Sequence, residues 1–135
     1  MATKIYVNLP VKDLQRSVRF FQTMGFGFNP QLSDETAACM AISDDIFAML
    51  LTEAKFREVA RRPVADTSRM TEVLTSLSVE SRKRVNQLVE RALAQGGREM
   101  REPEDHGFMF GRSFSDLDGH IWEIVYMDQD AMERA

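Results

Sequence analysis

The sequence has little of the chemistry from which disulfides and metal centres are built, with one cysteine and two histidines in 135 residues. A single cysteine cannot form an internal disulfide, which favours a reducing compartment. Cys39 has no base or acid beside it in sequence, so we expect it to fill core space rather than to act as a nucleophile. No apolar run approaches the roughly 20 residues that a membrane-spanning helix needs, so no membrane partner is expected.

Basic residues are fewer than acidic ones: the chain has 17 Lys and Arg and 21 Asp and Glu, which gives a net charge of -4. This balance argues against nucleic acid or an anionic membrane as the main partner. Residues 1–4 lead directly into a strand pattern without a secretory segment, so a cytoplasmic protein is expected. Hydrophobic residues make up 44% of the chain, enough for one compact soluble unit with one core.

Two stretches of the chain show the same order of predicted elements. In the first, Asp13 is a good N-cap and Gly25 a good end for a helix. The predicted elements there are a strand over residues 4–9, a helix over 14–24 and strands over 26–32, 36–42 and 46–52. A polar helix over 53–62 and an aperiodic segment over 63–69 follow. The second stretch is predicted to contain a strand over 72–79, a helix over 81–95, a short strand over 98–101, a loop over 103–106 and a hairpin. Both stretches therefore read as β-α-β-β-β, an α+β protein.

The hairpin consists of two runs rich in aromatic and β-branched residues, 108–115 and 120–126, around the turn signal Asp116-Leu117-Asp118-Gly119. With a turn over 116–119, Arg112 falls opposite Glu123. Since side chains alternate along a strand, this register places one set of side chains on a single face. The set is Phe110, Arg112, Phe114, Ile121, Glu123 and Val125. A carboxylate on an apolar face is either paired, here with Arg112, or functional.

The opening run Leu9-Pro10-Val11-Lys12-Asp13-Leu14 and the run from Asp116 to Glu123, set in tandem βαβββ stretches, resemble the vicinal oxygen chelate superfamily. This superfamily includes glyoxalase I, bleomycin-resistance proteins and extradiol dioxygenases, and the chain looks closest to predicted lactoylglutathione lyases. The resemblance covers nearly the whole chain and implies one domain over residues 1–135. It implies modules over about 4–53 and 71–127, joined by a connector over 54–70, whose curved mixed sheet forms an open cleft with helices on the outer faces. It also implies a homodimer.

Metal-using members of this superfamily hold a divalent ion with side chains from strands one, four, five and eight. In this sequence the matching positions are Tyr6, Leu50, Leu74 and Glu123, of which Glu123 is the one assured donor. Glu53 and Glu72 are poorly placed substitutes, and the neighbours Met49, Leu51, Val73 and Thr75 are no better. His120 is three residues from Glu123, on the opposite face of a strand, and His106 lies in a loop. A catalytic site needs about three protein ligands, so we expect no intact metal site and no cofactor.

A cleft without metal would be lined by apolar and aromatic side chains with a few polar groups, as small-molecule pockets usually are. These residues are Tyr6, Asn8, Leu50, Leu74, Ser76, Phe110, Arg112, Phe114 and Glu123. The sequence therefore predicts a protein that binds a small apolar or aromatic molecule. The alternative is a lyase or dioxygenase that uses nickel, zinc, manganese or iron, with Glu123 as ligand and catalytic group. A filled core with a structural or partner-binding role is a third possibility, and the roles of His106 and His120 stay open.

Overall fold

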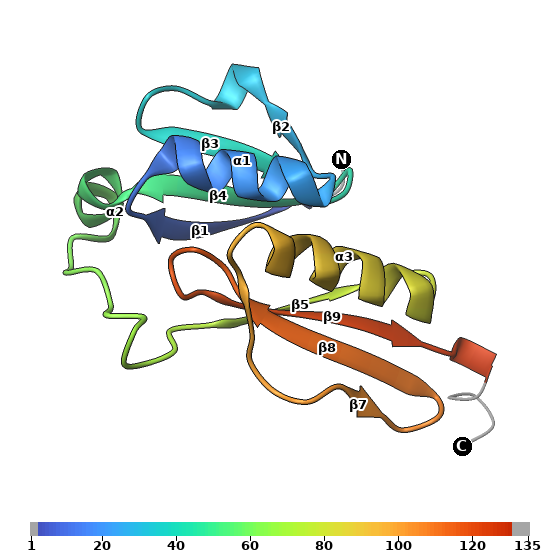
Figure 1. Ribbon diagram of the computed structural model, residues 1–135. Helices are drawn as coiled ribbons and strands as arrows, with labels where there is room; N and C mark the ends of the chain where they lie inside the picture. Colours follow the sequence, from blue (N-terminus) through green and yellow to red (C-terminus); the bar gives the residue numbers. More distant parts are fainter. Residues whose placement is uncertain (1–2, 131–135) are drawn as a thin grey trace. The chain divides into compact units, whose positions relative to one another are not determined.

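The protein is described by a computed structural model over residues 3–130, in which the chain divides into two compact units, Met1–Asp66 and Thr67–Ala135. The described residues contain three α-helices and two mixed sheets, one sheet in each unit (Figure 1). The first unit follows a strand–helix–strand–strand–strand order, and the second unit has the same order with one additional short strand, Glu104–Asp105, so the predicted α+β class is confirmed. Within residues 3–130, none of the helices has the length and apolar character that crossing a membrane requires.

The first unit builds a four-stranded sheet in the order β1-β4-β3-β2, in which β1 runs parallel to β4. Its elements are β1 (Ile5–Val11), α1 (Leu14–Met24), β2 (Gly27–Asn29), the 3-10 helix η1 (Pro30–Leu32), β3 (Ala37–Ala41), β4 (Ile46–Thr52) and α2 (Glu53–Ala60). The predicted caps of α1 are confirmed, since Asp13 accepts a hydrogen bond from the Arg16 amide and Gly25 adopts a φ of 110°. The buried side of α1 packs on the sheet face that carries Leu9 and Ala38.

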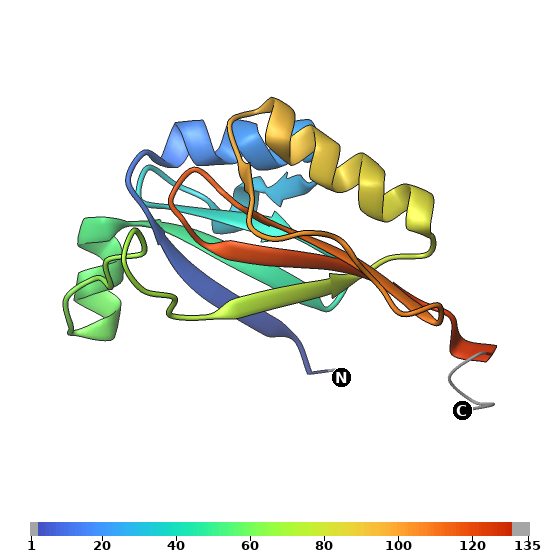
Figure 2. The same ribbon diagram turned by 60° about the horizontal axis from the view of Figure 1, so that its bottom comes forward.

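The second unit builds its sheet in the order β5-β9-β8-β6, with β7 also paired to β8. Its elements are β5 (Leu74–Ser78), α3 (Arg82–Ala94), β6 (Arg98–Glu99), β7 (Glu104–Asp105), β8 (Met109–Ser115) and β9 (Ile121–Met127). Figure 2 shows α3 lying along one face of this sheet. Ser81, the first residue of the predicted helix over 81–95, accepts a hydrogen bond from the Arg84 amide and so caps α3. The core beneath α3 is formed by Phe114, Trp122 and Ile124, all buried.

Two segments differ from the predicted secondary structure. The strand predicted over 26–32 ends at Asn29, because Pro30 begins η1 and the Asn29 side chain accepts a hydrogen bond from the Gln31 amide. Proline has no amide to donate to a sheet ladder, which explains the early end. The loop predicted over 103–106 contains the short strand β7, which pairs with Gly111 and Phe110 of β8.

The register of the β8–β9 hairpin differs from the predicted one by a single residue. The amide of Asp116 donates to the carbonyl of His120, and the Gly119 amide donates to the carbonyl of Asp116. The loop is therefore the three residues Leu117–Gly119, with Gly119 at a φ of 84°, which is a common hairpin geometry. As a result Glu123 lies opposite Ser113, and the predicted pairing with Arg112 is wrong.

Candidate functional site

The candidate site lies on the sheet face of the second unit that α3 does not cover. On this face Glu123 of β9 is flanked by Ser113 of β8 and Ser76 of β5. The neighbouring row across the sheet contains Ser115, Ile121 and Leu74, since directly paired residues project from the same face. Leu74 and Ser76 thus share the face of Glu123, and Leu74 is 58% exposed.

Three residues predicted to share this face lie on the other one, beneath α3. Phe114 is fully buried in the core, and the ring of Phe110 lies 5.2 Å from the guanidinium of Arg82. Arg112 is only 9% exposed, and its guanidinium contacts three side chains, Glu99 at 2.9 Å, Glu90 at 3.0 Å and Asn86 at 2.9 Å. The hydrogen bond to Glu99 raises the pKa of Arg112. The assignment of these residues to the face of Glu123 was wrong because a one-residue slip in register exchanges the two faces of a strand.

In the first unit the predicted lining residues also divide between two faces. Leu50 is fully buried and pairs with Leu9 and Ala38 on the face that α1 covers, so its predicted place beside Tyr6 was wrong. Tyr6 and Asn8 lie on the opposite face, where Tyr6 stacks on Phe47 with ring centroids 4.8 Å apart. Tyr6 remains 42% exposed. Leu50 and Asn8 lie on opposite faces because side chains alternate along a strand and Met49, rather than Leu50, pairs with Asn8.

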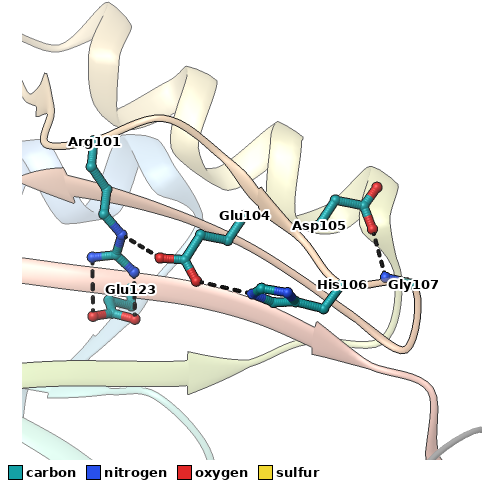
Figure 3. A network of polar contacts seen from close by, with 6 residues as sticks. All are labelled: Arg101, Glu104, Asp105, His106, Gly107 and Glu123. Atoms are coloured by element: carbon teal, nitrogen blue, oxygen red, sulfur yellow. Dashed lines mark hydrogen bonds and ion pairs between the residues drawn. The ribbon is translucent and has the colours of Figure 1, made fainter.

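The carboxylate of Glu123 is held by a guanidinium that the sequence did not point to, that of Arg101. The two nitrogens Nη1 and Nη2 lie 3.4 and 3.2 Å from the two oxygens of Glu123, and Nε donates to Glu104 at 2.9 Å (Figure 3). Glu104 in turn lies 3.4 Å from Nε2 of His106. The hydrogen bond with Glu123 raises the pKa of Arg101, and those with His106 and Arg101 lower the pKa of Glu104. Because Arg101 and Glu123 are 22 residues apart, no local pattern could have paired them.

This donor set does not fit a divalent metal ion. Among residues 3–130 no three His, Cys, Asp or Glu side chains gather closely enough to hold one. On the sheet, the direct neighbours of Glu123 are serines, and its carboxylate already has a cation in Arg101. Glu72 and Glu53 were the possible substitute metal ligands. Glu72 is hydrogen-bonded to Nδ1 of His120 at 2.6 Å, and Glu53 is the first residue of α2.

One hydroxyl beside Glu123 lacks a hydrogen bond. Ser113 is fully buried, and its Oγ has no partner among the described residues. Buried polar atoms are nearly always satisfied, so such an atom calls for an explanation. Since Ser113 lies directly opposite Glu123, the unsatisfied oxygen belongs to the candidate site.

Asp116 organises the end of the hairpin next to this face. Its Oδ1 accepts hydrogen bonds from the amides of Asp118 and His120, and its Oδ2 accepts one from the indole of Trp122 at 3.0 Å. Burial raises the pKa of Asp116, while the nearby His120 opposes that shift. The hydroxyl of Thr67 donates to the carbonyl of Asp118, and Glu72 is joined to His120. These two contacts fasten the segment Thr67–Glu72 to the hairpin.

A cavity of about 540 Å³ lies within the second unit between this fastened segment and the sheet. Its floor includes Ser115 and Ile121, which form the row next to Glu123. Arg69 and Arg98 line it from the connector and from β6. The volume is within the range of small-molecule sites, roughly 300–1,000 Å³.

Cys39 does not belong to this site. It lies fully buried on β3 of the first unit, where its amide donates to Oγ of Ser33. Burial raises the pKa of its thiol, which keeps the thiol protonated and weakens it as a nucleophile. These contacts agree with its predicted role as a core residue.

Comparisons with known proteins support the relationship that the motifs suggested. The family model described as bleomycin resistance protein-like N-terminal matches residues 3–43. No curated protein sequence matches the chain. Among solved structures, hypothetical protein SA1046 from S. aureus is similar, with a TM-score of 0.79 and 28% identity over 93% of this chain and 94% of that one.

Two further structures share the fold at lower identity. A glyoxalase/bleomycin resistance protein/dioxygenase family enzyme from Burkholderia phytofirmans PsJN has a TM-score of 0.78 and 16% identity, over 93% of this chain and 99% of that one. The fosfomycin resistance protein FosX from Mesorhizobium loti has a TM-score of 0.69 and 13% identity, over 98% of both chains. The match of residues 3–43 therefore shows similarity to bleomycin resistance proteins over the first part of the chain, and the solved structures show that the chain has the fold of glyoxalase and bleomycin-resistance proteins.

Proposed function

We propose that this protein binds a small molecule on the Glu123 face of the second unit and uses no metal ion there. The observation that carries the proposal is the pairing of Glu123 with Arg101, which gives the carboxylate a permanent cation. A divalent site needs about three protein ligands, and the serines beside Glu123 do not supply them. The predicted alternative, a metal-dependent lyase or dioxygenase, has no donor set of this kind to support it in residues 3–130.

The surroundings of Glu123 favour binding over a purely structural role. The side chain of Glu123 is half-buried (19% exposed) and is paired with the exposed Arg101. Beside it lie the unsatisfied buried hydroxyl of Ser113 and a cavity, so the site offers fixed polar groups and room for a ligand. Pockets that bind small molecules combine these features. The matching family model is named for resistance to bleomycin and one similar structure for resistance to fosfomycin, which agrees with a small molecule as the ligand. Cytoplasmic location and a homodimer belong to the same proposal and rest on the family resemblance.

Metal content tests the first half of the proposal. The purified protein is incubated in turn with nickel, zinc, manganese and iron, desalted, and analysed by mass spectrometry for bound metal. We expect no stoichiometric ion in any sample, and no difference between the native protein, Glu123→Gln and Glu102→Gln. Glu102 is an exposed acid whose substitution removes the same charge. One ion per chain that is lost in Glu123→Gln and kept in Glu102→Gln would support the lyase or dioxygenase instead.

A screen of small neutral aromatic molecules tests the second half. Binding is followed by backbone amide chemical shifts, and we expect the shifts to gather at Ser76, Ser113 and Glu123. Glu123→Gln should weaken binding, since it removes the carboxylate and releases Arg101, whereas Glu102→Gln should not. Shifts scattered over both units, or equal binding by the two variants, would contradict a site at Glu123.

A further inference from the structure

The cavity beside the hairpin has a charge opposite to that of the whole chain. Arg69 and Arg98 both line it, and neither is paired with a carboxylate of residues 3–130. The protein as a whole carries a net charge of -4, whereas the charged residues that line this cavity are two arginines and one aspartate, Asp116. Arginine presents a planar set of donors that matches phosphate and carboxylate groups.

The carboxylates near the cavity are already engaged. Asp116 accepts three hydrogen bonds from Asp118, His120 and Trp122, and Glu72 is joined to His120. Glu123 is paired with Arg101, which also bonds Glu104. An anion entering the cavity therefore meets two guanidinium groups, while both carboxylate oxygens of Asp116 are already engaged by hydrogen-bond donors of the hairpin.

The pairing of β6, β8 and β9 places the cavity next to Glu123, on the same face of the sheet. Arg98 pairs with Ser115, and Ser115 pairs with Ile121, so the three form a row across β6, β8 and β9. Glu123 lies two residues further along β9, which is a separation of about 7 Å. A ligand of ordinary size can thus reach both rows. Met70, Met100 and Leu117 add apolar lining beside the arginines.

We propose that the cavity between segment Thr67–Glu72 and the hairpin binds the phosphate or carboxylate group of a small organic anion, through Arg69 and Arg98. The apolar body of the ligand packs on the methionine and leucine side chains and extends toward Glu123. This inference rests on the proposed binding function and gives the chemical class of the ligand: an anion with an apolar part, which binds more tightly than a neutral aromatic molecule.

Titration with three probes tests the inference: phenyl phosphate, phenol and inorganic phosphate, with the native, chelator-treated protein. We expect phenyl phosphate to shift the amides of Gly96, Leu117 and Gly119, which line the cavity. Phenol should bind at least about tenfold more weakly, since a charge-assisted hydrogen bond is worth roughly a factor of ten. Inorganic phosphate should also bind more weakly because it leaves the apolar lining uncovered; equal binding of inorganic phosphate would overturn the claim of an apolar part.

Matched variants assign the effect to the two arginines. Arg69→Gln and Arg98→Gln should each weaken phenyl phosphate binding by about tenfold. Lys83→Gln removes the same charge near the start of α3, about 20 Å from Gly96, and should leave binding unchanged. Both arginines are exposed, so their variants should fold normally, which circular dichroism checks.

The possible results separate this inference from the proposed function. Failure of phenyl phosphate to bind, or equal binding by the arginine variants and Lys83→Gln, overturns the anion site. If neutral aromatic molecules still shift Ser76 and Glu123, the proposed function stands without it. A stoichiometric metal ion at Glu123 overturns the proposed function, whatever phenyl phosphate does.

Discussion

At the β8–β9 hairpin, one buried carboxylate determines how three donors are satisfied. Asp116 accepts hydrogen bonds from the amides of Asp118 and His120 and from the indole of Trp122. Burial raises its pKa, so keeping it ionised costs free energy. The three hydrogen bonds offset that cost, because each unpaired buried donor would cost about 1–3 kcal/mol.

Replacement of Asp116 by alanine should therefore lower the free energy of unfolding by about 3 kcal/mol. The gain from removing a buried charge is smaller than the loss from leaving the amides and the indole without an acceptor. Urea denaturation followed by tryptophan fluorescence measures the change at Trp122. Asp44→Ala is the control, since Asp44 lies exposed in the turn before β4 and should change stability by less than about 0.5 kcal/mol. Similar losses in the two variants would contradict the role given to Asp116.

The pair of Arg82 and Asp105 gives a prediction about pH. Hydrogen bonds from Arg82, with a further one from the Gly107 amide, lower the pKa of Asp105 from 3.8 to about 2. Between these two values the folded state holds fewer protons than the unfolded state. The contribution of the pair to stability is therefore complete above about pH 3.8 and is lost as the pH falls through 2.

Carbon-detected NMR titration of the Asp105 carboxyl tests this expectation. Arg82→Gln should return its pKa toward 3.8, whereas Lys83→Gln, on the next residue of α3, should leave it near 2. A pKa that stays near 2 in Arg82→Gln would show that the Gly107 amide, and not Arg82, is the main cause.

The hairpin loop is the element on which the candidate site depends. Gly119 adopts a φ of 84°, and a Cβ there would lie 2.9 Å from the hydroxyl oxygen of Thr67 and 3.0 Å from its carbonyl oxygen. Glycine at this position permits both the turn and the close approach of the connector. Segment Thr67–Glu72 forms one wall of the cavity, and it can be held against the hairpin only if Thr67 comes this close to Gly119.

Gly119→Ala should destabilise the protein by about 2 kcal/mol, because alanine is strained at a positive φ and would push against Thr67. Gly27→Ala is the matched control, since a Cβ at that glycine meets nothing within 4 Å and its φ is not positive. Thermal unfolding of the two variants gives the comparison. We also expect Gly119→Ala to weaken phenyl phosphate binding, and equal stability of the two variants would contradict the proposed constraint.

Local signals predicted the helices and most strands, because caps and periodicity are properties of neighbouring residues. Asp13, Gly25 and Ser81 mark helix ends in the sequence and do so in the structure. The register of the hairpin could not be derived in the same way, since a turn over four residues and a loop over three fit the same Asp and Gly signals. The difference of one residue moved Arg112 beneath α3 and brought Ser113 opposite Glu123.

The partner of Glu123 shows a second limit of the sequence. Arg101 lies in an irregular segment after β6, where no periodicity fixes its direction, and its contact with Glu123 spans 22 residues. The two arginines of the cavity are also far apart in the chain. Their meeting follows from the pairing of β6 with β8 and from the contact of Thr67 with Asp118, both of which are tertiary.

For the whole molecule, the proposed homodimer has a simple test. Each sheet ends in an outer strand, β1 in the first unit and β5 in the second, that carries exposed apolar side chains, including Ile5, Tyr6 and Leu74. Exposed apolar side chains favour association. Light scattering should therefore give twice the chain mass of 15.5 kDa. A mass equal to that of one chain at all concentrations would remove this proposal.

The arginine on Glu123 has a consequence for how the protein depends on its surroundings. Arg101 is part of the polypeptide, so the positive charge at the site is made with the chain and cannot be stripped by a chelator or exchanged for another ion. Its guanidinium also keeps its charge across the physiological pH range. Under the proposed metal-free function, iron starvation or zinc excess would leave the site unaltered, and its occupancy would follow the concentration of its ligand alone.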